Sequence, residues 1–332
     1  MRIAINGLGR IGRSFLRASA QYPELEVVAI NDPATARNLS HLIKYDTVHG
    51  PFKGSVEAIS EEALRIQAQE VQLSHTTNPQ DLPWQELELD LILESSGRFL
   101  TADATRSHQT LARWTILSAP PKDESKTIVM GANQSLIQKD DKLLSCASCT
   151  TNSVAPLLEV VDALCGIEHA FITTVHSYTT DQQLQDGPHK DFRRGRAAAE
   201  SIVPTTTGAA KAITKIYPRL EGRIGGAGIR VPVPDGSLTD ITFTVRKAPL
   251  ESAVNEAFWQ ASQKGPWKNY LGYTDDPIVS RDVIGSPYSC LFDQELTTVL
   301  GPMVKVVGWY DNEWGYSHRL CDLMRLLAQD FL

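Results

Sequence analysis

The apolar positions in the first half of the chain form short runs of strand length, and helical spacing fills the stretches between them. An apolar run at Ile3–Ile5 leads into a glycine-rich turn at residues 6–12, and a helical stretch follows. A second run, Val27–Asn31, ends at Asp32. Further strands are expected at Leu89–Glu94, Thr115–Ser118, Ile128–Gly131 and Leu143–Cys146. Strands that alternate with helices in this way predict a doubly wound parallel sheet.

A helix with a defined start and stop follows this region. Apolar residues recur at helical spacing from Asn152 onward, and Gly166 marks the expected end. The β-branched run Phe171–Val175 then reads as a strand that ends at His176. Residues 177–204 are polar and too long for an ordinary connection, which indicates a functional loop.

The remaining pattern predicts mixed helices and strands. A hydroxyl-rich start at residues 205–208 opens a helix through Lys215, and strands follow at Gly228–Val231 and Asp240–Val245. The segment from Trp314 to Leu332 has i, i+3, i+4 apolar spacing and predicts an amphipathic helix that caps the fold.

The glycine-rich turn predicts a dinucleotide site. Gly7 permits a tight turn, Gly9 lets the backbone approach a pyrophosphate, and Gly12 lets helix and strand pack closely. The turn follows a strand and opens a helix, and Asp32 lies twenty residues beyond Gly12, so the context that a Rossmann-type fold requires is complete. The Asp32 carboxylate binds ribose hydroxyls and repels a 2′-phosphate, which favours NAD over NADP.

Composition narrows the class of protein. The chain has 332 residues, 42% hydrophobic and 21% charged, as a globular protein with two cores would. A net charge of −7 argues against a dedicated nucleic-acid site. We expect no signal peptide and no membrane span. Five cysteines without framework spacing read as reduced thiols, so we expect a cytoplasmic protein. No metal-ligand spacing occurs, since the one CxxC lacks a second pair.

Cys149 is the strongest candidate for chemistry. It stands in the tract Ser148–Asn152 at the start of the expected helix, where free backbone N–H groups and the helix dipole favour negative charge. A cysteine in this position is expected to be partly thiolate at neutral pH, and the thiolate is the nucleophile. A buried, inert cysteine before a core helix is the alternative.

Seven stretches of the chain resemble the phosphorylating glyceraldehyde-3-phosphate dehydrogenase family, and the likeness runs from end to end. The matching stretches are INGLGRIGR at 5–13, HLIKYDTVHG at 41–50, ASCTTN at 147–152, HSYT at 176–179, HKDFRRGRAAAESIVPTTTGAAKA at 189–212, RVPVPDGSLTD at 230–240 and WYDNEWGYSHRL at 309–320.

The resemblance implies an α/β architecture with two domains. It implies an N-terminal Rossmann-type NAD-binding domain at residues 1–148, built on a doubly wound parallel sheet. A C-terminal α+β catalytic domain with a mainly antiparallel sheet would span residues 149–312, including the loop 177–204. The helix at 313–332 would return to the NAD-binding domain. The family is a homotetramer and acts on a phosphorylated aldehyde and inorganic phosphate.

The resemblance also implies roles for individual residues. Cys149 matches the family's nucleophile and His176 its base. The cofactor-binding positions are Gly7, Gly9, Arg10, Ile11, Gly12, Asp32, Ser118, Pro188 and Asn312. Of these, Asn312 would hydrogen-bond the nicotinamide carboxamide, and Pro188 with Asp32 fits the NAD-preferring pattern. The substrate-phosphate pocket matches Thr179, Asp181 and Arg230. The inorganic-phosphate pocket matches Ser148, Thr150, Thr207 and Gly208, with Arg194 near by.

The chemistry implied is oxidative phosphorylation through a thioester on Cys149. Three positions depart from the commonest family pattern, namely Pro33, Arg98 and Cys146. The first two bear on cofactor affinity, and Cys146 is either inert or able to trap an oxidised Cys149 as a disulfide.

Three other readings remain open. Erythrose-4-phosphate dehydrogenase, whose product is a free acid, is suggested by Asp181-Gln182-Gln183, although TTTGAAKA at 205–212 favours the glyceraldehyde branch. Aspartate-semialdehyde dehydrogenase shares the chemistry but lacks HSYT. A catalytically silent NAD- or RNA-binding regulator is disfavoured by the intact Cys149, His176 and Arg230.

Overall fold

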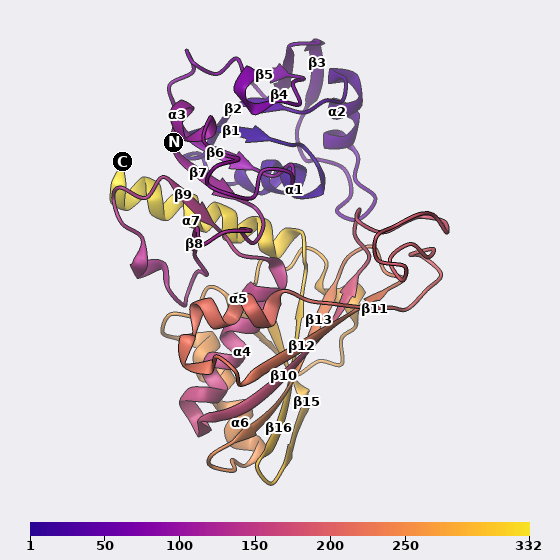
Figure 1. Cartoon of the computed structure of the whole chain (residues 1–332), viewed down its shortest axis with the longest axis vertical. Coiled ribbons are helices and arrows are strands. Elements are labelled where there is room, and N and C mark those ends of the chain that lie inside the picture. The colour runs from indigo at the N-terminus through magenta and orange to yellow at the C-terminus, as the bar shows by residue number, and fades with distance from the viewer. The chain divides into compact units, whose positions relative to one another are not determined.

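The computed structural model describes all of residues 1–332 and divides the chain into two compact units. Unit 1 comprises residues 1–128, 134–147 and 317–332, and unit 2 comprises residues 129–133 and 148–316. Each unit is built around one sheet (Figure 1). The two sheets differ in how their strands pair, and this difference decides how each unit places its functional side chains.

The sheet of unit 1 has nine strands in the order β3-β4-β5-β2-β1-β6-β7-β9-β8. All pairs are parallel except β3–β4 and β4–β5, which form an antiparallel meander at one edge. The strands are β1 (Arg2–Asn6), β2 (Glu26–Asn31), β3 (Val56–Ser60), β4 (Ala63–Ile66), β5 (Gln69–Ser74), β6 (Leu89–Glu94), β7 (Ala112–Leu117), β8 (Lys126–Thr127) and β9 (Leu143–Ser145). This confirms the parallel, doubly wound character expected of the first half.

Three helices of unit 1 lie within its N-terminal segment and a fourth closes the chain. They are α1 (Arg10–Ser19), α2 (Ala36–Lys44), α3 (His108–Leu111) and α7 (Trp314–Phe331), the last of which enters unit 1 at Ser317. On α7, the Arg325 guanidinium lies 2.6 Å from a carboxylate oxygen of Glu24, and the His318 ring hydrogen-bonds Tyr22. These contacts hold the C-terminal helix beside the turn that follows α1.

One strand expected in the first half of the chain does not form, so that prediction is wrong. The apolar run at 128–131 was expected to pair, but only Lys126–Thr127 joins the sheet as β8. The chain turns immediately afterwards, because the Ala132 N–H donates to the carbonyl of Val129 and Gly131 takes φ +93°. A Cβ at Gly131 would meet the Trp267 ring at 2.7 Å, so the run is buried by packing rather than by strand pairing.

The sheet of unit 2 has seven strands in the order β11-β12-β10-β13-β16-β15-β14. It is mainly antiparallel, and only β10–β12 and β14–β15 run parallel. The strands are β10 (Ile167–Ser177), β11 (Val203–Thr205), β12 (Ile224–Val231), β13 (Ser237–Val245), β14 (Leu271–Thr274), β15 (Cys290–Leu300) and β16 (Met303–Tyr310). This agrees with the α+β character that the resemblance implied.

Three helices cover one face of this sheet (Figure 1). They are α4 (Cys149–Cys165), α5 (Ala209–Ile216) and α6 (Glu251–Gln263). Helix α4 is buried along most of its length, as the continuous apolar spacing after Asn152 predicts, and it ends at Gly166 with φ +68°. Short 3-10 helices occupy Pro79–Asp81, Gln134–Leu136, Pro218–Leu220 and Ser280–Val283.

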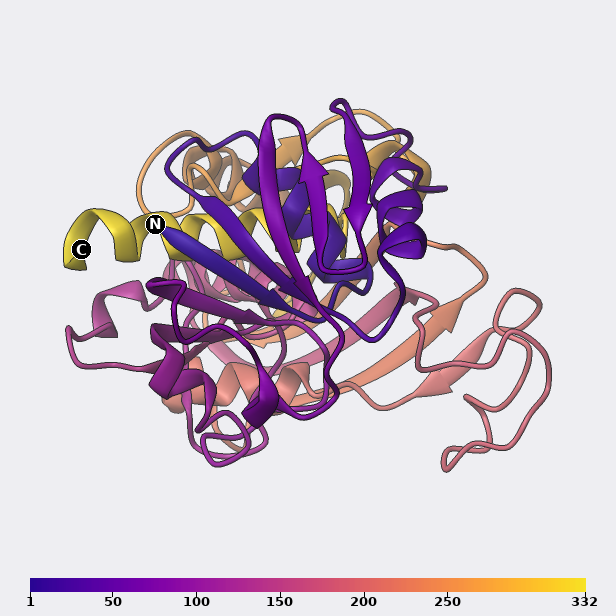
Figure 2. The same ribbon diagram turned by 90° about the horizontal axis from the view of Figure 1, so that it is seen from above.

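The segment between β10 and β11, residues 178–202, is a long irregular loop. It extends away from the strand ends of the sheet of unit 2 (Figure 2). It carries three apolar side chains that are largely exposed, with Leu184 at 80%, Phe192 at 90% and Ile202 at 70% exposure. An exposed apolar surface of this kind commonly marks an interaction site.

No helix of the structure is both long enough and apolar enough to cross a bilayer.

Candidate functional site

The glycine-rich turn of unit 1 is built by backbone that tolerates no side chains at two positions. Gly7 has φ +96°, and a Cβ there would meet the Ser96 backbone at 2.5 Å. A Cβ at Gly12 would meet the Gly7 carbonyl oxygen at 2.3 Å. At Gly9 the situation is the reverse, because the space beside its Cα is open. The turn is therefore tightly packed against the protein at Gly7 and Gly12, and it has free space beside Gly9.

The empty side of the turn faces a cavity of about 200 Å³. Its lining includes Gly9, Asp32, Pro33, Ser96 and Arg98. Helix α1 begins after Gly9, which has no side chain to cap it, so the start of the helix is open on the side of the cavity.

This arrangement fits the diphosphate and ribose of a dinucleotide. Uncapped N–H groups at a helix N-terminus bind anions, and an open Gly9 leaves room for the pyrophosphate. The Asp32 carboxylate accepts hydrogen bonds from the N–H groups of Leu8 and Ala34, both at 2.9 Å, which fixes it at the cavity wall. The residues present therefore fit NAD.

The other expected cofactor residues lie in different places. Ile11 is in the first turn of α1, and the Arg10 guanidinium forms an ion pair with Asp46 at 2.5 Å. Ser118 follows β7 and donates its N–H to the Glu94 carbonyl. Pro188 belongs to unit 2, where it is exposed on the loop 178–202.

In unit 2 the start of α4 places Cys149 where the sequence predicts it. Ser148 is the N-cap, and its hydroxyl accepts a hydrogen bond from the Thr151 N–H at 3.1 Å. The Asn152 side chain donates back to the Ser148 carbonyl at 2.9 Å. This capping fixes the helix end, so that Cys149 is the first helical residue, among N–H groups with no intrahelical acceptor.

His176 meets Cys149 at the strand ends of unit 2. Its Nε2 lies 3.4 Å from the Cys149 sulfur, within the range of a sulfur hydrogen bond. The register of β10 and β12 pairs His176 with Arg230, because the two strands run parallel and end together. Cys149 and His176 are 27 positions apart along the chain, and His176 and Arg230 are 54 apart. All three nevertheless meet at the carboxyl ends of β10 and β12.

The other ring nitrogen of His176 has two competing neighbours. Nδ1 lies 2.8 Å from the Ser177 carbonyl oxygen, which requires a proton on Nδ1, and 2.5 Å from a nitrogen of Arg230, which requires a lone pair there. The Arg230 nitrogen also donates to the Ser177 carbonyl at 3.1 Å. When Nδ1 donates to Ser177, Nε2 presents a lone pair to the thiol of Cys149.

Burial acts on the charge state of Cys149 and His176. Burial raises the pKa of Cys149 to about 11, and the charge of Arg230 and the hydrogen bond from Thr150 do not offset it. Burial, followed by the charge of Arg230, lowers the pKa of His176 to about 3. Both directions favour a neutral thiol beside a neutral imidazole. These directions oppose the expectation of a partly ionised sulfur, because spacing along the chain does not reveal desolvation.

The residues matched to the substrate-phosphate pocket form a connected polar group. The Thr179 hydroxyl donates to Asp181, and Arg194 forms an ion pair with the same carboxylate. Burial on its own would raise the pKa of Asp181, but Thr179, Arg230 and Arg194 outweigh it and the pKa is lowered. Arg194 also donates to the Thr205 hydroxyl at 2.9 Å. Its guanidinium is thus held by the loop and by β11.

The residues matched to the inorganic-phosphate pocket are partly committed to other contacts. The Ser148 hydroxyl caps α4, and the Thr150 hydroxyl lies 3.0 Å from the Tyr310 hydroxyl in the buried interior. Gly208 precedes α5 without a side-chain cap, and no atom lies within 4 Å of the position that a Cβ would take there. Thr207 accepts a hydrogen bond from the Ala209 N–H at 3.2 Å.

The side chain of Asn312 is held through its amide oxygen. Its Oδ1 accepts hydrogen bonds from Ser177 at 3.0 Å and Ser237 at 2.6 Å, while its Nδ2 makes none. An amide fixed by its oxygen presents its nitrogen as a donor, which suits a carboxamide oxygen.

Sequence reasoning missed the side chains that support these residues. Tyr310 bridges the hydroxyls of Thr150 and Thr174 and lies edge-on to the His176 ring at a centroid distance of 6.0 Å. In unit 1, the pocket lining also includes Asn6 and Asn31. The available signal was their place as polar residues at the carboxyl ends of apolar strands, where open α/β sheets bind ligands.

Comparisons with known proteins give one consistent result. Residues 1–102 match the NAD binding domain of glyceraldehyde 3-phosphate dehydrogenase, and residues 148–312 match its C-terminal domain. Glyceraldehyde-3-phosphate dehydrogenase of Streptomyces coelicolor is 47% identical over 327 residues, which is 97% of each chain. The Geobacillus stearothermophilus enzyme of the same name is 45% identical over 331 residues, covering 99% of this chain and 98% of its own.

Proposed function

The chain belongs to the glyceraldehyde-3-phosphate dehydrogenase family, an NAD-dependent oxidoreductase family, and we propose that it carries out the phosphorylating reaction. In this proposal D-glyceraldehyde 3-phosphate, NAD and inorganic phosphate give 1,3-bisphosphoglycerate and NADH through a thioester on Cys149. The observation that carries it is the 3.4 Å approach of the His176 Nε2 to the Cys149 sulfur, with Arg230 beside the same ring.

The first step forms a carbon–sulfur bond. The Cys149 sulfur attacks the aldehyde carbon while His176 Nε2 takes the thiol proton, and that proton then passes to the new oxyanion to give a thiohemiacetal. The N–H groups at the start of α4 and the protonated ring of His176 stabilise the oxyanion, an effect worth about 3 kcal/mol in comparable sites.

Binding of the substrate phosphate makes His176 a better base. The charge of Arg230 is one of the two causes that lower the pKa of His176. A phosphate dianion paired with Arg230 offsets this charge, so the pKa of His176 rises when the substrate is in place.

The remaining steps conserve the energy of oxidation. His176 removes the hydroxyl proton of the thiohemiacetal as the carbonyl re-forms, which leaves a thioester on Cys149. When bound, NAD accepts the hydride that leaves the same carbon. Phosphate oxygen then attacks the thioester carbon, the sulfur leaves, and an acyl phosphate is released. The open start of α5 at Gly208 offers N–H donors for that phosphate.

The residue assignments and domain limits belong to the same proposal. Residues 1–148 hold NAD, residues 149–312 carry the chemistry, and residues 313–332 return to the first domain. Thr179, Asp181 and Arg230 hold the substrate phosphate, while Ser148, Thr150, Thr207 and Gly208, with Arg194, serve inorganic phosphate. We place the enzyme in the cytoplasm.

The decisive experiment compares two aldehyde phosphates with and without inorganic phosphate. NADH formation from glyceraldehyde 3-phosphate should require phosphate and should stop in Cys149→Ser. Equal rates with and without phosphate, or a preference for erythrose 4-phosphate, would overturn the phosphorylating assignment.

A second candidate function rests on Gln182. Its Nε2 is buried and makes no hydrogen bond, while its Oε1 accepts from the Thr179 N–H at 3.3 Å. An unsatisfied buried donor beside Thr179 suits the additional hydroxyl of a four-carbon aldehyde phosphate, the erythrose 4-phosphate class. Gln182→Leu should then reduce turnover of the four-carbon substrate only.

We also propose that the chain assembles as a homotetramer. The exposed apolar side chains of the loop 178–202, above all Phe192 at 90% exposure, favour a protein partner. The sheet of unit 2 adds Phe171 at 53% and Leu300 at 65%. Light scattering coupled to gel filtration should give four chain masses, and Phe192→Ser should lower the mass at low concentration. A monomer at every concentration would contradict the proposal.

A further inference from the structure

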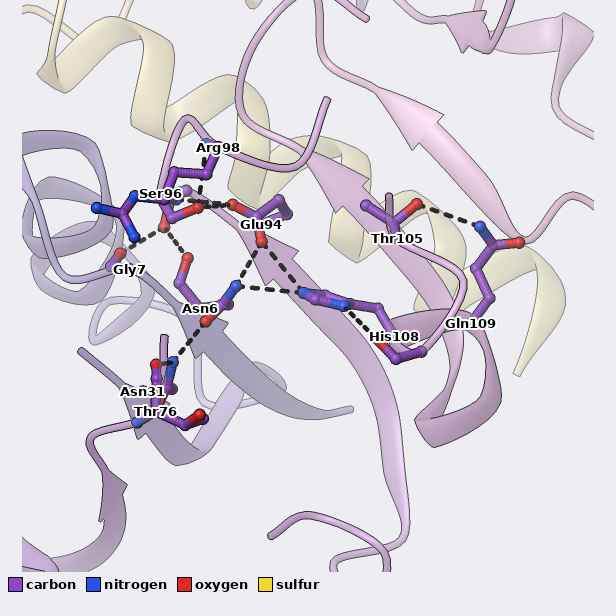
Figure 3. Close-up of polar contacts among 12 residues, drawn as sticks. Asn6, Gly7, Asn31, Thr76, Glu94, Ser96, Arg98, Thr105, His108 and Gln109 are labelled. Carbon is purple, nitrogen blue, oxygen red and sulfur yellow. Dashed lines mark hydrogen bonds and ion pairs between the residues drawn. The ribbon is translucent and has the colours of Figure 1, made fainter. Parts of the chain in front are cut away.

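A buried carboxylate lies beneath the cofactor cavity of unit 1. Glu94, the last residue of β6, is 1% exposed, and four donors point at it. Its Oε1 accepts hydrogen bonds from the N–H of Ser96 at 2.8 Å and from the hydroxyl of the same residue. Its Oε2 accepts from the Asn6 amide at 2.5 Å and from His108 Nε2 at 3.1 Å (Figure 3). Four donors and no acceptor indicate an ionised carboxylate.

The network continues from Glu94 to the opposite wall of the cavity. Asn6 gives its N–H to Glu94, and its oxygen accepts from Asn31 at 2.8 Å. Asn31 in turn holds the Thr76 backbone at both its N–H and its carbonyl, at 3.0 and 2.9 Å (Figure 3). The charge of Glu94 thus decides which way the Asn6 amide faces, and Asn6 decides the orientation of Asn31.

Four of the six members of this network line the cavity, and Glu94 and His108 do not. Asn6, Asn31, Thr76 and Ser96 belong to the lining, whereas His108 stands behind them on α3. The His108 side chain is fully buried, and its ring lies against Phe99, itself a lining residue, at a centroid distance of 6.2 Å. His108 therefore reaches the cavity only through other residues.

The proton on His108 can be assigned from its neighbours. The Ser96 N–H and the Asn6 amide already donate one hydrogen bond to each oxygen of Glu94, which assigns a carboxylate independently of His108. His108 Nε2 lies 3.1 Å from the same oxygen as Asn6 Nδ2, and the two nitrogens are 3.3 Å apart. Nε2 must carry a proton, since an unprotonated Nε2 would face the carboxylate with its lone pair.

We propose that His108 is a positioning residue for the adenosine end of the cofactor. Its N–H completes the donor set of Glu94, which orients Asn6 and Asn31 and so fixes the cavity wall that carries Thr76. Removing this donor leaves the carboxylate in the protein interior with a missing partner, and the network rearranges to satisfy it. The inference rests on the assignment of this cavity to NAD.

The test uses two variants of His108 in the full-length protein. His108→Leu removes the donor at similar volume, and His108→Gln restores an N–H at similar reach. Calorimetric titration with ADP-ribose, which lacks the nicotinamide, isolates the adenosine end. We expect His108→Leu to bind ADP-ribose about tenfold more weakly than the unaltered protein, and His108→Gln to bind within about twofold of it. The KM for NAD should rise in parallel, while the KM for the aldehyde phosphate stays unchanged.

A purely structural role predicts a different pattern. It would lower the melting temperature of both variants equally and would change the alkylation rate of Cys149 in the absence of cofactor. Our proposal predicts an unchanged alkylation rate, because Cys149 belongs to unit 2. Unaltered affinity of His108→Leu for ADP-ribose would overturn the positioning role while leaving the NAD assignment intact.

A second variant covers the case in which His108→Leu does not fold. Glu94→Gln has the same shape but turns an amide N–H toward the donors of Ser96 or Asn6, and it should also weaken ADP-ribose binding about tenfold. Full affinity in Glu94→Gln would overturn the proposal. If the unaltered protein fails to bind ADP-ribose at all, the cofactor assignment is itself wrong and the inference falls with it.

Discussion

The cofactor cavity of unit 1 and the Cys149 site of unit 2 both bury ionisable side chains, but they treat them differently. Glu94 faces four donors and has a partner for each oxygen. In unit 2, the Cys149 sulfur has one strong neighbour, His176, whose other nitrogen is contested between Arg230 and a carbonyl. The first region is satisfied before any ligand arrives, and the second is not.

This difference matches what the proposed function requires of each region. A wall that orients a cofactor has to keep one geometry, and a fully satisfied buried network provides it. A nucleophile and its base must exchange a proton during turnover, so neither protonation state can be held too firmly. In the proposed mechanism, burial favours the neutral forms of Cys149 and His176, and the bound substrate shifts this balance.

The largest expected effect comes from a variant of unit 2 that abolishes turnover and leaves cofactor binding in unit 1 unchanged. Cys149→Ser should reduce phosphate-dependent NADH formation by about 10⁴-fold or more, because a hydroxyl beside a weakly basic imidazole does not form the thioester. The same variant should bind ADP-ribose within about twofold of the unaltered protein, as measured by calorimetry. Near-normal turnover in Cys149→Ser would refute the mechanism, whereas loss of ADP-ribose binding would refute the independence of the two regions.

The next prediction concerns the charge state of the resting thiol. Because the pKa of Cys149 is raised to about 11, its alkylation by iodoacetamide should accelerate about tenfold per pH unit from about pH 6 to about pH 9, without a plateau. Mass spectrometry of the Cys149 peptide gives the rate, and His176→Asn serves as the comparison. A rate that is already flat near pH 6 would reveal an ionised pair and would remove the contrast with Glu94.

In both regions, the features that the sequence predicts correctly are those formed by residues close together along the chain. The turn at residues 6–12 fixes its own backbone, so its glycines and Asp32 could be assigned from spacing alone. The same holds for α4, which begins at Cys149 within the tract Ser148–Asn152 and stops at Gly166, as the pattern predicts. Each of these features depends on residues that are close together along the chain.

The features that the sequence could not predict depend on tertiary contacts. The meeting of His176 and Arg230 depends on strand register across 54 residues, which periodicity does not encode. The raised pKa of Cys149 depends on burial by distant segments. The position of His108 beneath the cavity depends on α3, a helix of only four residues with no periodic signal. The resemblance to a family supplied the site residues that spacing did not.

Cys146 is a further residue whose chemical role depends on burial, which the sequence spacing does not reveal. The CxxC spacing allowed it a role as a disulfide partner, but it is fully buried and burial raises its pKa to about 12. A thiol in this state reacts slowly with oxidants, since the thiolate is the reactive form. Burial therefore favours the inert alternative.

The third prediction concerns Asp235, a buried acid of unit 2 that lies close to a second acid, Asp311. Burial, followed by the charge of Asp311, raises the pKa of Asp235 to about 10. The folded state thus binds this proton more tightly than the unfolded state does, so the stability it contributes is complete below the unfolded pKa and is lost as pH rises toward the folded pKa. Asp235→Asn keeps a neutral group of the same shape and removes this loss.

The expected result is a change in the pH dependence of melting. Relative to the unaltered protein, Asp235→Asn should gain a few °C in melting temperature between about pH 5 and about pH 9. The exposed Asp276→Asn provides the control and should show no such trend. A constant difference across pH would mean that Asp235 is ionised in the fold, as Glu94 is.

The smallest expected effect compares how the two regions handle left-handed backbone. The turn of the cofactor cavity uses glycine at Gly7, with φ +96°, whereas the turn into α4 passes through Ala147 at φ +57°. An alanine in this conformation carries strain that glycine lacks, although glycine loses more chain entropy on folding. Ala147→Gly should therefore raise the free energy of unfolding by about 0.5 kcal/mol in urea titrations. Ala18→Gly, the same change inside α1, should lower it by about 1 kcal/mol. A loss of stability in both would show that Ala147 is unstrained, and the turn beside the nucleophile would then be as relaxed as the cofactor turn.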